Sequence, residues 1–484
     1  MPCASSGEIS VQSLTVRYPD RERPALDSVS ERIRPGETVV VTGASGSGKT
    51  TLFRVLGGFV PSMIRAKVEG EVLIDGISIL TKDSPRPAAG VGLVQQDPDA
   101  QICTLSVWEE VAFGPENLCL PPEEVTARVA ESLASLGIAH LAGRETTRLS
   151  GGEKQRVAIA SILALRPRVI LLDEPTANLD PGGAKQVFDL LRSLGERDGR
   201  TLVLAEHRLA PLLPLHPRLL LLEEGKVLLR RPSVAYSDLD SLGLRARWEI
   251  PRPVVVRSGP PALVLEGVSF AYGEAPLLDR LTLRLWPGEV LGVIGPNGSG
   301  KTTLLRLAAG LERPQAGRVL RPKSPVLGFV FQHPHQQIFE RTVRREFSVE
   351  DEIAGARLAD LLRRARLDGL EEAPPLSLSL GEQRRLTVAT ALSRGPNLLL
   401  LDEPFIGQDR ENVVWILSQI LAARERGAVT LLVSHDIPLV ASLCDRLLYL
   451  GEEAVEGETA EVFDHLESTR REAFTPGYWE GGLR

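Results

Sequence analysis

Short apolar runs that end at a glycine mark two buried strands in this 484-residue chain. Residues 37–43 and 289–295 read ETVVVTG and EVLGVIG. Each is followed by a glycine-rich stretch and then by a segment with helical spacing, KTTLFRVLGG at 49–58 and KTTLLRLAAG at 301–310. A continuous apolar run bounded by turn residues is typical of a strand buried on both faces. The pattern therefore predicts the order strand, loop, helix at two places in the chain.

Further apolar runs end at polar residues. Residues 169–173 and 398–402 read VILLD and LLLLD, and residues 201–207 and 430–436 read TLVLAEH and TLLVSHD. Strands that alternate with helices, with polar side chains at the carboxyl ends of the strands, indicate a parallel α/β sheet. The predicted fold class is therefore α/β.

The chain repeats itself. VVVTGASGSGKTTLFRVLGG at 39–58 returns as LGVIGPNGSGKTTLLRLAAG at 291–310, and RLSGGEKQRVAIASIL at 148–163 returns as SLSLGEQRRLTVATAL at 377–392. Ordered repetition of this kind indicates a tandem of two copies. The second copy is shorter because it lacks the strand and turn that GEVLIDGISIL predicts in the first.

The repeat sets the expected domain organisation. The first copy spans 1–235, a linker rich in proline and arginine spans 236–261, the second copy spans 262–465, and 466–484 form a tail without a clear pattern. Two spans are predicted to be mainly helical and to form a helical subdomain in each copy, 107–149 and 343–378.

Composition narrows the function classes. The 56 basic and 63 acidic residues give a net charge of −7, and no basic tract is present, which argues against a dedicated nucleic-acid binder. The four cysteines are scattered without zinc-binding spacing. The first residues lack the pattern of a secretory signal, and no apolar run reaches the ~18–20 residues of a membrane-spanning helix. We therefore expect a location on the cytosolic side of the cell.

Two glycine-rich loops predict phosphate binding. GASGSGKT at 43–50 and GPNGSGKT at 295–302 fit G-x-x-x-x-G-K-[ST]. Glycines let backbone N–H groups turn toward phosphate oxygens, and the following helix points its positive end at them. The lysine reaches the β- and γ-phosphates, and the threonine hydroxyl binds Mg²⁺. The predicted nucleotide-binding residues are Gly43, Ala44, Ser45, Gly46, Ser47, Gly48, Lys49, Thr50 and Thr51, and Gly295, Pro296, Asn297, Gly298, Ser299, Gly300, Lys301, Thr302 and Thr303.

Acidic residues follow two of the predicted strands. Asp173 and Asp402 end their strands and suit Mg²⁺ binding, together with Thr50 and Thr302. The next residues, Glu174 and Glu403, suit a general base that polarises the attacking water. Such a pair can also be a simple cap at a strand end. The phosphate loops upstream favour the catalytic interpretation.

One histidine follows a strand at nearly the same distance after the glutamate in each copy. These residues are His207 and His435. A lone histidine is usually an ordinary surface or core residue. The matched spacing instead favours a catalytic role, a hydrogen bond to the γ-phosphate and the attacking water.

A Ser-Gly-Gly turn opens a predicted helix in the first copy. Ser150, Gly151 and Gly152 lie in LSGGE, and the second copy reads LSLGE, with Ser379 and Gly381 on either side of Leu380. Such a turn offers N–H groups and a helix dipole to a phosphate. It cannot easily reach the phosphate loop of its own copy, which already has its own helix. A simple helix cap is the alternative.

Together these motifs resemble the ATP-binding-cassette ATPases, over nearly the whole chain and twice. The resemblance implies two P-loop ATPase domains in tandem, each with a parallel α/β core, an antiparallel β subdomain and a helical subdomain, and ATP and Mg²⁺ as ligands. It implies that Tyr18 and Tyr272 stack on adenine, and that Gln96 and Gln332 join Mg²⁺ to the contact with a membrane partner. It also implies that two cassettes close head to tail on two ATP molecules, each site borrowing the signature of the other.

A narrower resemblance concerns residues 95–118 and 331–343, QQDPDAQICTLSVWEEVAFGPENL and FQHPHQQIFERTV. They look like energy-coupling-factor ATPases, which drive uptake of vitamins or of cobalt and nickel ions. This resemblance implies a transmembrane coupling protein and a substrate-binding membrane protein as partners, no nucleic acid, and attachment to the cytoplasmic face of the cell membrane. The alternative is a soluble tandem ATPase of translation or DNA repair. The short proline-rich linker and the lack of a zinc-binding cysteine insertion count against it.

Leu380 predicts a difference between the two nucleotide sites. A leucine is costly where the backbone needs a positive φ, and its side chain stands where the backbone must approach phosphate. The site that the second signature would seal contains Lys49, Asp173, Glu174 and His207. That site is expected to be the weaker one.

Overall fold

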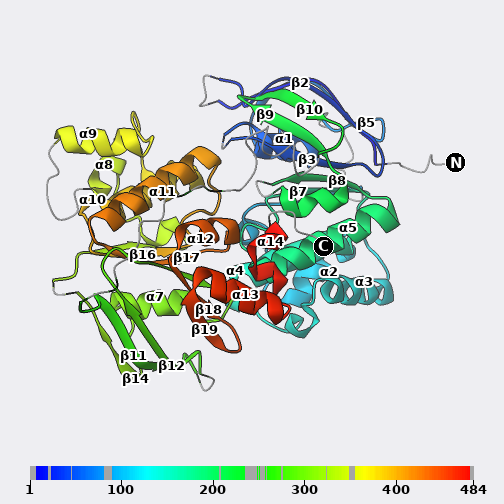
Figure 1. Cartoon of the computed structure of the whole chain (residues 1–484). Helices are drawn as coiled ribbons and strands as arrows, with labels where there is room; N and C mark the ends of the chain where they lie inside the picture. Colours follow the sequence, from blue (N-terminus) through cyan, green and yellow to red (C-terminus); the bar gives the residue numbers. More distant parts are fainter. Residues whose placement is uncertain are drawn as a thin grey trace. The chain divides into compact units, whose positions relative to one another are not determined.

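The computed structural model divides into two compact units, Met1–Arg245 with Trp479–Arg484 and Ala246–Tyr478. Each is described by itself below, with elements labelled as in Figure 1. The domain boundaries expected from the sequence stay a prediction, and most of the expected linker lies outside the described residues. The structure describes residues 7–19, 23–44, 46–80, 90–206, 209–234, 248, 250, 257, 259–273, 276–322, 324–347 and 355–479.

Unit 1 contains two sheets. A four-stranded antiparallel sheet has the order β2-β1-β4-β5, and a six-stranded sheet has the order β10-β9-β3-β8-β7-β6, parallel except for β10. The strands are β1 Ile9–Arg17, β2 Leu26–Ile33, β3 Thr38–Thr42, β4 Lys67–Ile74, β5 Ile77–Ser78, β6 Val91–Val94, β7 Val169–Asp173, β8 Thr201–Ala205, β9 Arg218–Glu223 and β10 Lys226–Arg231. The helices are α1 Lys49–Leu56, α2 Val107–Asn117, α3 Pro122–Ser135, α4 Gly151–Ala164 and α5 Pro181–Asp198.

Unit 2 repeats this plan with one strand fewer in its antiparallel sheet, β12-β11-β14, beside a six-stranded sheet of order β15-β16-β17-β13-β18-β19. The strands are β11 Leu263–Phe270, β12 Leu278–Leu285, β13 Val290–Ile294, β14 Ala316–Leu320, β15 Leu327–Val330, β16 Leu398–Asp402, β17 Val429–Val433, β18 Arg446–Leu450 and β19 Ala454–Glu458. The helices are α7 Lys301–Ala309, α8 Val343–Glu346, α9 Gly355–Arg364, α10 Leu380–Ser393, α11 Arg410–Glu425, α12 Ile437–Leu443 and α13 Thr459–Ser468, and α14 Pro476–Trp479 ends the described chain.

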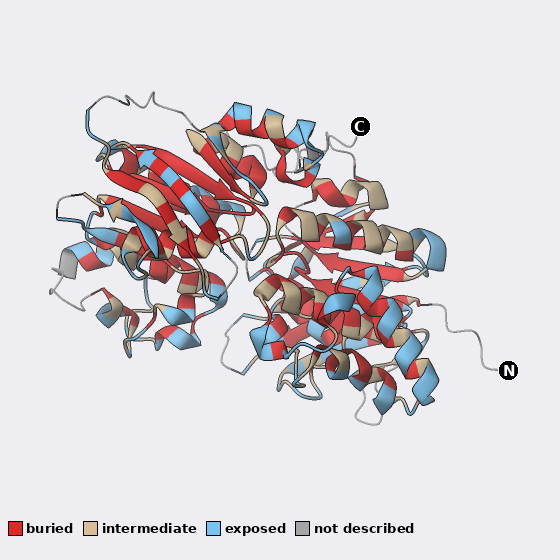
Figure 2. Cartoon of the chain, turned by 90° about the horizontal axis from the view of Figure 1, so that it is seen from below, coloured by how far each residue is buried: buried red, intermediate tan, exposed pale blue. Residues whose placement is uncertain are grey.

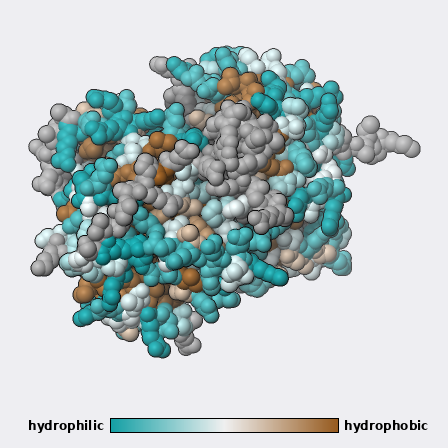
Figure 3. Space-filling view, in the orientation of Figure 1, coloured by the Kyte–Doolittle hydropathy of each residue, from teal (hydrophilic) through white to brown (hydrophobic). Residues whose placement is uncertain are grey.

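The core of each unit explains why the apolar runs form central strands. Leu52, Phe53, Val55 and Leu56 of α1 join side chains from both sheets of unit 1 in one cluster, and α7 does the same in unit 2. Burying one such side chain fully contributes about 1.5–3 kcal/mol. The central strands are buried along their whole length in Figure 2, whereas the outer helices alternate buried and exposed positions. On the face in Figure 3, hydrophilic residues predominate and hydrophobic ones form small separate patches.

These observations confirm the predicted fold class of two tandem cassettes. The predicted loss in the second copy is confirmed in part: among the described residues of unit 2, β14 pairs with β11 as β4 pairs with β1, and only a counterpart of β5 is absent. The span 107–149 is mainly helical as predicted, and 343–378 contains α8 and α9 around residues that are not described. The sequence predicts no element after 465, but two short helical turns follow α13. Phe474 is buried there against the ring of Tyr449, with centroids 5.5 Å apart, and this tertiary contact fixes the segment.

Candidate functional site

Each phosphate loop joins a central strand to the first helix of the core, β3 to α1 and β13 to α7. The loop backbone requires glycine at its start. Gly43 and Gly295 both have φ of +146°, and a Cβ would lie 2.0 Å from the carbonyl oxygen of Leu222 and of Leu450, respectively. No other residue fits so close to backbone, so the two positions fix the loop path.

The lysine of each loop folds back onto the loop that precedes it. The Lys49 ammonium donates to the carbonyl oxygens of Gly43 and Ala44 at 2.7 and 2.9 Å. Lys301 donates to Gly295 and Pro296 at 2.9 and 2.7 Å. The ammonium group therefore lies inside the curved backbone of the loop, where it could bind a phosphate group.

Two buried hydroxyls support this fit. The Oγ atoms of Ser47 and Ser299 are buried and have no hydrogen-bond partner in the described part of the chain. A buried unpaired hydroxyl is unfavourable unless a ligand completes it. The residues therefore fit a phosphate group. Ser45, also predicted to bind nucleotide, lies outside the described residues.

The two strand-end aspartates stand beside the threonines of the loops. The Thr302 hydroxyl donates to Asp402 Oδ2 at 2.7 Å. Burial and the neighbouring Glu174 raise the pKa of Asp173 to about 6, although hydrogen bonding to Thr50 and the charge of Lys49 oppose this. Burial also raises the pKa of Asp402. Oxygen ligands of this kind suit Mg²⁺, and binding a cation there would favour the ionised carboxylates.

The raised pKa of Asp173 leads to a prediction. The folded chain binds more protons than the unfolded one between the ordinary pKa of 3.8 and about 6, so this carboxyl reduces stability as pH rises through that window. Asp173→Asn should therefore stabilise the nucleotide-free chain at pH 7.5, by at most about 3 kcal/mol. Thermal melts should show this gain shrinking at pH 4.5. A gain of equal size at both pH values would contradict the assigned cause.

The glutamates that follow adopt an uncommon backbone conformation in both units. Glu174 and Glu403 have φ of 49° and 52°. The backbone N–H of each bonds to the neighbouring parallel strand, at Ala205 and Val433. Both side chains are buried. Such strain in non-glycine residues clusters at functional sites, and here it turns each carboxylate out of its strand direction.

The carboxylates have different neighbours. The Gln96 side-chain amide donates to Glu174 Oε2 at 2.9 Å, which places the first predicted glutamine beside the first predicted base. In unit 2 the backbone N–H of His435 donates to Glu403 Oε2 at 3.1 Å. His435 Nε2 lies 3.5 Å from Glu403 Oε1 and 3.2 Å from Asn297 Oδ1 of the phosphate loop. The structure thus brings base, histidine and phosphate loop together in unit 2. His207 lies outside the described residues.

The serines of the two signature segments begin helices. Ser150 is the N-cap of α4 and Ser379 the N-cap of α10, each in a reciprocal capping box with Glu153 or Glu382. The cap interpretation is therefore correct locally. It leaves the helix N-terminus available to an anion.

One expectation about the second signature is wrong. Gly151, the counterpart of Leu380, is the first helical residue of α4 and has no positive φ. A Cβ there would meet only Asn178, at 4.0 Å. Because the backbone is ordinary at this position, Leu380 carries no strain. What distinguishes the second signature is an apolar side chain, 45% exposed, at the start of α10.

The two tyrosines predicted to stack on adenine differ in their surroundings. The Tyr18 hydroxyl lies 3.4 Å from Thr51 Oγ1, in the first turn of α1. Tyr272 is exposed and packs edge-on against Phe270. The first tyrosine is therefore beside its phosphate loop, and the second is largely exposed.

Sequence reasoning missed a device that both units contain. The Glu110 carboxylate accepts from the backbone N–H groups of Cys103 and Thr104, both at 3.0 Å. The Glu346 carboxylate accepts from Phe339 and Glu340 at 2.7 and 2.6 Å. Each glutamate pins the loop between the glutamine segment and the helical subdomain. The only available signal was the repeated glutamate, three residues after Val107 or Val343.

The pinned loops display apolar side chains. Leu105 is 78% exposed and Phe339 is 80% exposed. Leaving such a side chain in water forgoes about 1.5–3 kcal/mol of burial. A rigid loop that keeps it exposed in both units is typical of a contact surface.

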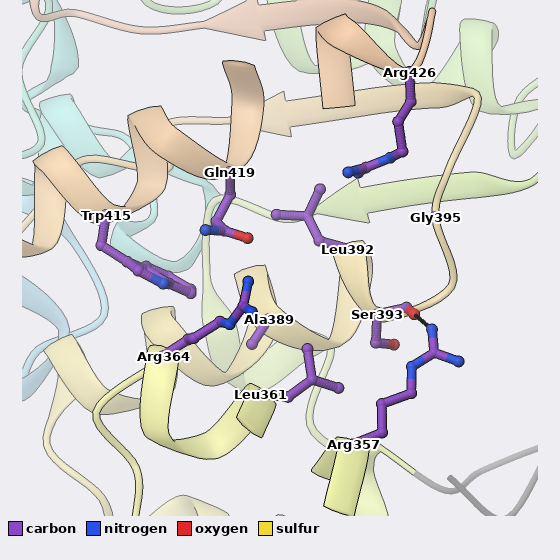
Figure 4. Close-up of a pocket in the computed structure, with 10 residues that line it drawn as sticks. All are labelled: Arg357, Leu361, Arg364, Ala389, Leu392, Ser393, Gly395, Trp415, Gln419 and Arg426. Atoms are coloured by element: carbon purple, nitrogen blue, oxygen red, sulfur yellow. Dashed lines mark hydrogen bonds between the residues drawn. The ribbon is translucent and has the colours of Figure 1, made fainter. Parts of the chain in front are cut away.

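A cavity of about 330 Å³ lies in unit 2 between α9, α10 and α11 (Figure 4). Its arginines have local structural roles. Arg357 donates to the Ser393 carbonyl at the end of α10, Arg364 pairs with Asp360, and Arg426 caps α11. Because the C-terminal end of a helix carries partial negative charge, the Arg357 guanidinium offsets that charge at the end of α10. We assign the cavity no part in nucleotide chemistry.

No helix in the described ranges combines the length and the apolar character that crossing a membrane requires.

Comparison with known proteins gives consistent matches. The family model described as ABC transporter matches residues 26–177 and 278–406. A protein of Methanosarcina acetivorans, provisionally named an ABC transporter ATP-binding protein, is 32% identical over 96% of this chain and 88% of its own length. A Bacillus subtilis protein provisionally named for HMP/thiamine import is 32% identical over 94% of this chain and 92% of its own.

Among solved structures, an archaeal ribosome recycling factor crystallised with a ribosomal stalk protein matches with a TM-score of 0.69. It covers 94% of this chain and 92% of that one, at 22% identity. At this identity the likeness shows the fold alone.

Proposed function

The chain belongs to the ABC transporter family and its cassettes are ATP-hydrolysing domains, and from this premise we propose that it is the ATPase subunit of a membrane importer of the energy-coupling-factor type. The solute is a vitamin or a transition-metal ion. The partners are a transmembrane coupling protein and a substrate-binding membrane protein, which hold the chain at the cytoplasmic face of the membrane. The relative named for HMP/thiamine import, similar over nearly its full length, supports this proposal.

Chemistry at each site follows from the residues described. Lys301 leaves the loop carbonyls for the β- and γ-phosphates, and the N–H groups of the loop and of the α7 N-terminus receive their oxygens. Thr302, Asp402 and Gln332 are the residues that would hold Mg²⁺, which supplies charge neutralisation at the phosphates. Glu403 takes the proton of the attacking water, and His435 holds the water and the γ-phosphate in line. Lys49, Thr50, Asp173, Gln96 and Glu174 take the same roles in the first cassette.

Closure completes both sites. Ser150, Gly151 and Gly152 would cover the nucleotide of the second cassette, and Ser379 and Gly381 that of the first. ATP binding then favours the closed pair, and hydrolysis with release reopens it, a gating cycle that the membrane partners convert into uptake.

The observation that carries the proposal is the pair of exposed apolar side chains beside the glutamine segments, Leu105 and Phe339. Their loops are held by Glu110 and Glu346, so each loop presents its apolar side chain before a partner binds. A membrane protein that inserts helices against both loops would sense the state of both glutamines.

Docking through this surface can be tested by charge insertion. Phe339→Asp or Leu105→Asp should reduce recovery of the co-expressed membrane subunits with the chain at least about 10-fold, since buried apolar anchors dominate interface energies. Equilibrium binding of Mg-ATP by the isolated chain should be unchanged. Leu228→Asp is the control, because Leu228 is also an exposed apolar side chain, 62% exposed, but lies on β10. Full recovery of the membrane subunits with both loop variants would overturn the proposed docking surface.

The competing function is a soluble tandem ATPase of translation or DNA repair. Co-purification from cells separates the two. If the chain is an importer subunit, it should co-purify with membrane proteins. If it is a soluble ATPase of translation or DNA repair, it should co-purify with ribosomes or DNA and without membrane proteins.

A further inference from the structure

A buried arginine on the signature helix of unit 2 makes its hydrogen bonds to backbone carbonyls and not to a carboxylate of the described residues. Arg384 lies on α10, five residues after the N-cap Ser379, and is 2% exposed. Its two terminal nitrogens donate to backbone carbonyls of the glutamine segment, one to Phe331 at 2.7 Å and the other to Gln332. Its Nε has no hydrogen-bond partner among the described residues. Buried arginine is rare unless paired, so this placement calls for an explanation.

The charge of Arg384 strengthens its hydrogen bonds to the glutamine segment. Burial lowers its pKa to about 10, and the nearby carboxylates of Glu403 and Asp402 oppose that shift. The guanidinium therefore stays charged at neutral pH. A cation held in a buried place by two carbonyl groups makes stronger hydrogen bonds than a neutral donor would.

The first cassette holds its glutamine segment in a different way. Gln155 occupies the matching place on α4, is fully buried, and neither of its amide atoms has a partner among the described residues. There Gln96 is held through its side chain, by Glu174. In unit 2 no matching hydrogen bond joins Gln332 to Glu403 within the described residues, and the backbone is held instead.

We propose that Arg384 is a positioning residue of the second nucleotide site, a clamp that ties the signature helix to the backbone of Phe331 and Gln332. The clamp sets where the Gln332 side chain stands. Any movement of α10 is thereby transmitted to the glutamine segment in unit 2. The first cassette has Gln155 at this position, and it ties α4 to the segment after Gln96 through side chains instead, Lys154 to Asp99 and Gln101 to the Ala158 carbonyl. The metal-dependent part of this inference rests on the Mg²⁺ role proposed above for Gln332.

Hydrogen exchange on the full chain tests the clamp. Arg384→Gln should raise amide exchange in residues 331–337 at least about 10-fold, because two charge-assisted hydrogen bonds are lost. Residues 95–101 of unit 1 should not change. Arg385→Gln is the matched control, because Arg385 is also buried on α10 but donates to Ala365 of the helical subdomain. Unchanged exchange at 331–337, or an equal rise with Arg385→Gln, would overturn the clamp.

A Mg²⁺ titration distinguishes a positioning role of Arg384 from a general contribution to stability. Arg384→Gln should raise the Mg²⁺ concentration for half-maximal nucleotide binding several-fold, measured with a fluorescent ATP analogue, and Arg384→Lys should recover part of it because one ammonium can reach one carbonyl. Arg385→Gln should leave it unchanged. Faster exchange in 331–337 with an unchanged Mg²⁺ requirement would support the clamp and overturn the metal role of Gln332.

Discussion

Replacing Glu403 with glutamine should lower steady-state ATP hydrolysis by the full chain about 10²–10³-fold. Glutamine keeps the size of the side chain, which is 3% exposed beside His435, but it cannot accept the proton of the attacking water. Nucleotide affinity should change little, because the phosphate loop is untouched. The measurement is phosphate release under saturating Mg-ATP with the proposed membrane subunits present.

The matched variant in the first cassette should have a smaller effect. The signature proposed to cover the first site carries the exposed Leu380, whereas the second site is covered by Gly151. Because Leu380 causes no backbone strain, its side chain is the remaining cause of any difference. Glu174→Gln should leave measurable turnover, and Leu380→Gly should raise turnover in the Glu403→Gln background. Equal losses for both glutamate variants, without such a gain, would mean that the two sites work alike.

The sequence was sufficient to predict those features of the site that depend on local backbone conformation. The phosphate loops follow from glycine spacing, because only glycine fits at Gly43 and Gly295. The central strands follow from apolar runs such as 169–173. The Ser150 and Ser379 caps follow from a serine three residues before a glutamate.

The features that the sequence could not predict depend mainly on contacts between residues far apart in the chain. The strained backbone of Glu403 depends on a hydrogen bond to Val433 in another strand. The burial of Arg384 depends on carbonyl groups 52 and 53 residues away. The interpretation of Leu380 failed for a local reason, since the Ser-x-x-Glu cap places residues 151 and 380 at the first helical position, where φ is ordinary.

Gly43→Ala and Gly295→Ala should each unfold or misplace a phosphate loop. The new methyl group would lie 2.0 Å from a backbone carbonyl oxygen, Leu222 O in unit 1 and Leu450 O in unit 2, and the residue would keep a φ of +146°. Neither strand can move aside, because β9 and β18 pair with the loop-bearing strands β3 and β13. Strain and overpacking together should cost about 3 kcal/mol or more of unfolding free energy.

Thermal unfolding and Mg-ATP binding of the full chain measure this loss unit by unit. Gly143→Ala and Gly273→Ala are the matched controls, because a Cβ at either position meets nothing within 4 Å and neither glycine has a positive φ. Each loop variant should lose one of two bound nucleotides, and the controls should keep both. If Gly43→Ala and Gly295→Ala melt and bind like the controls, the tight path of the phosphate loop described here is wrong. A loss confined to the altered cassette would instead show that each loop binds its nucleotide through its own backbone, which is the condition for two separately mutable ATP sites in one chain.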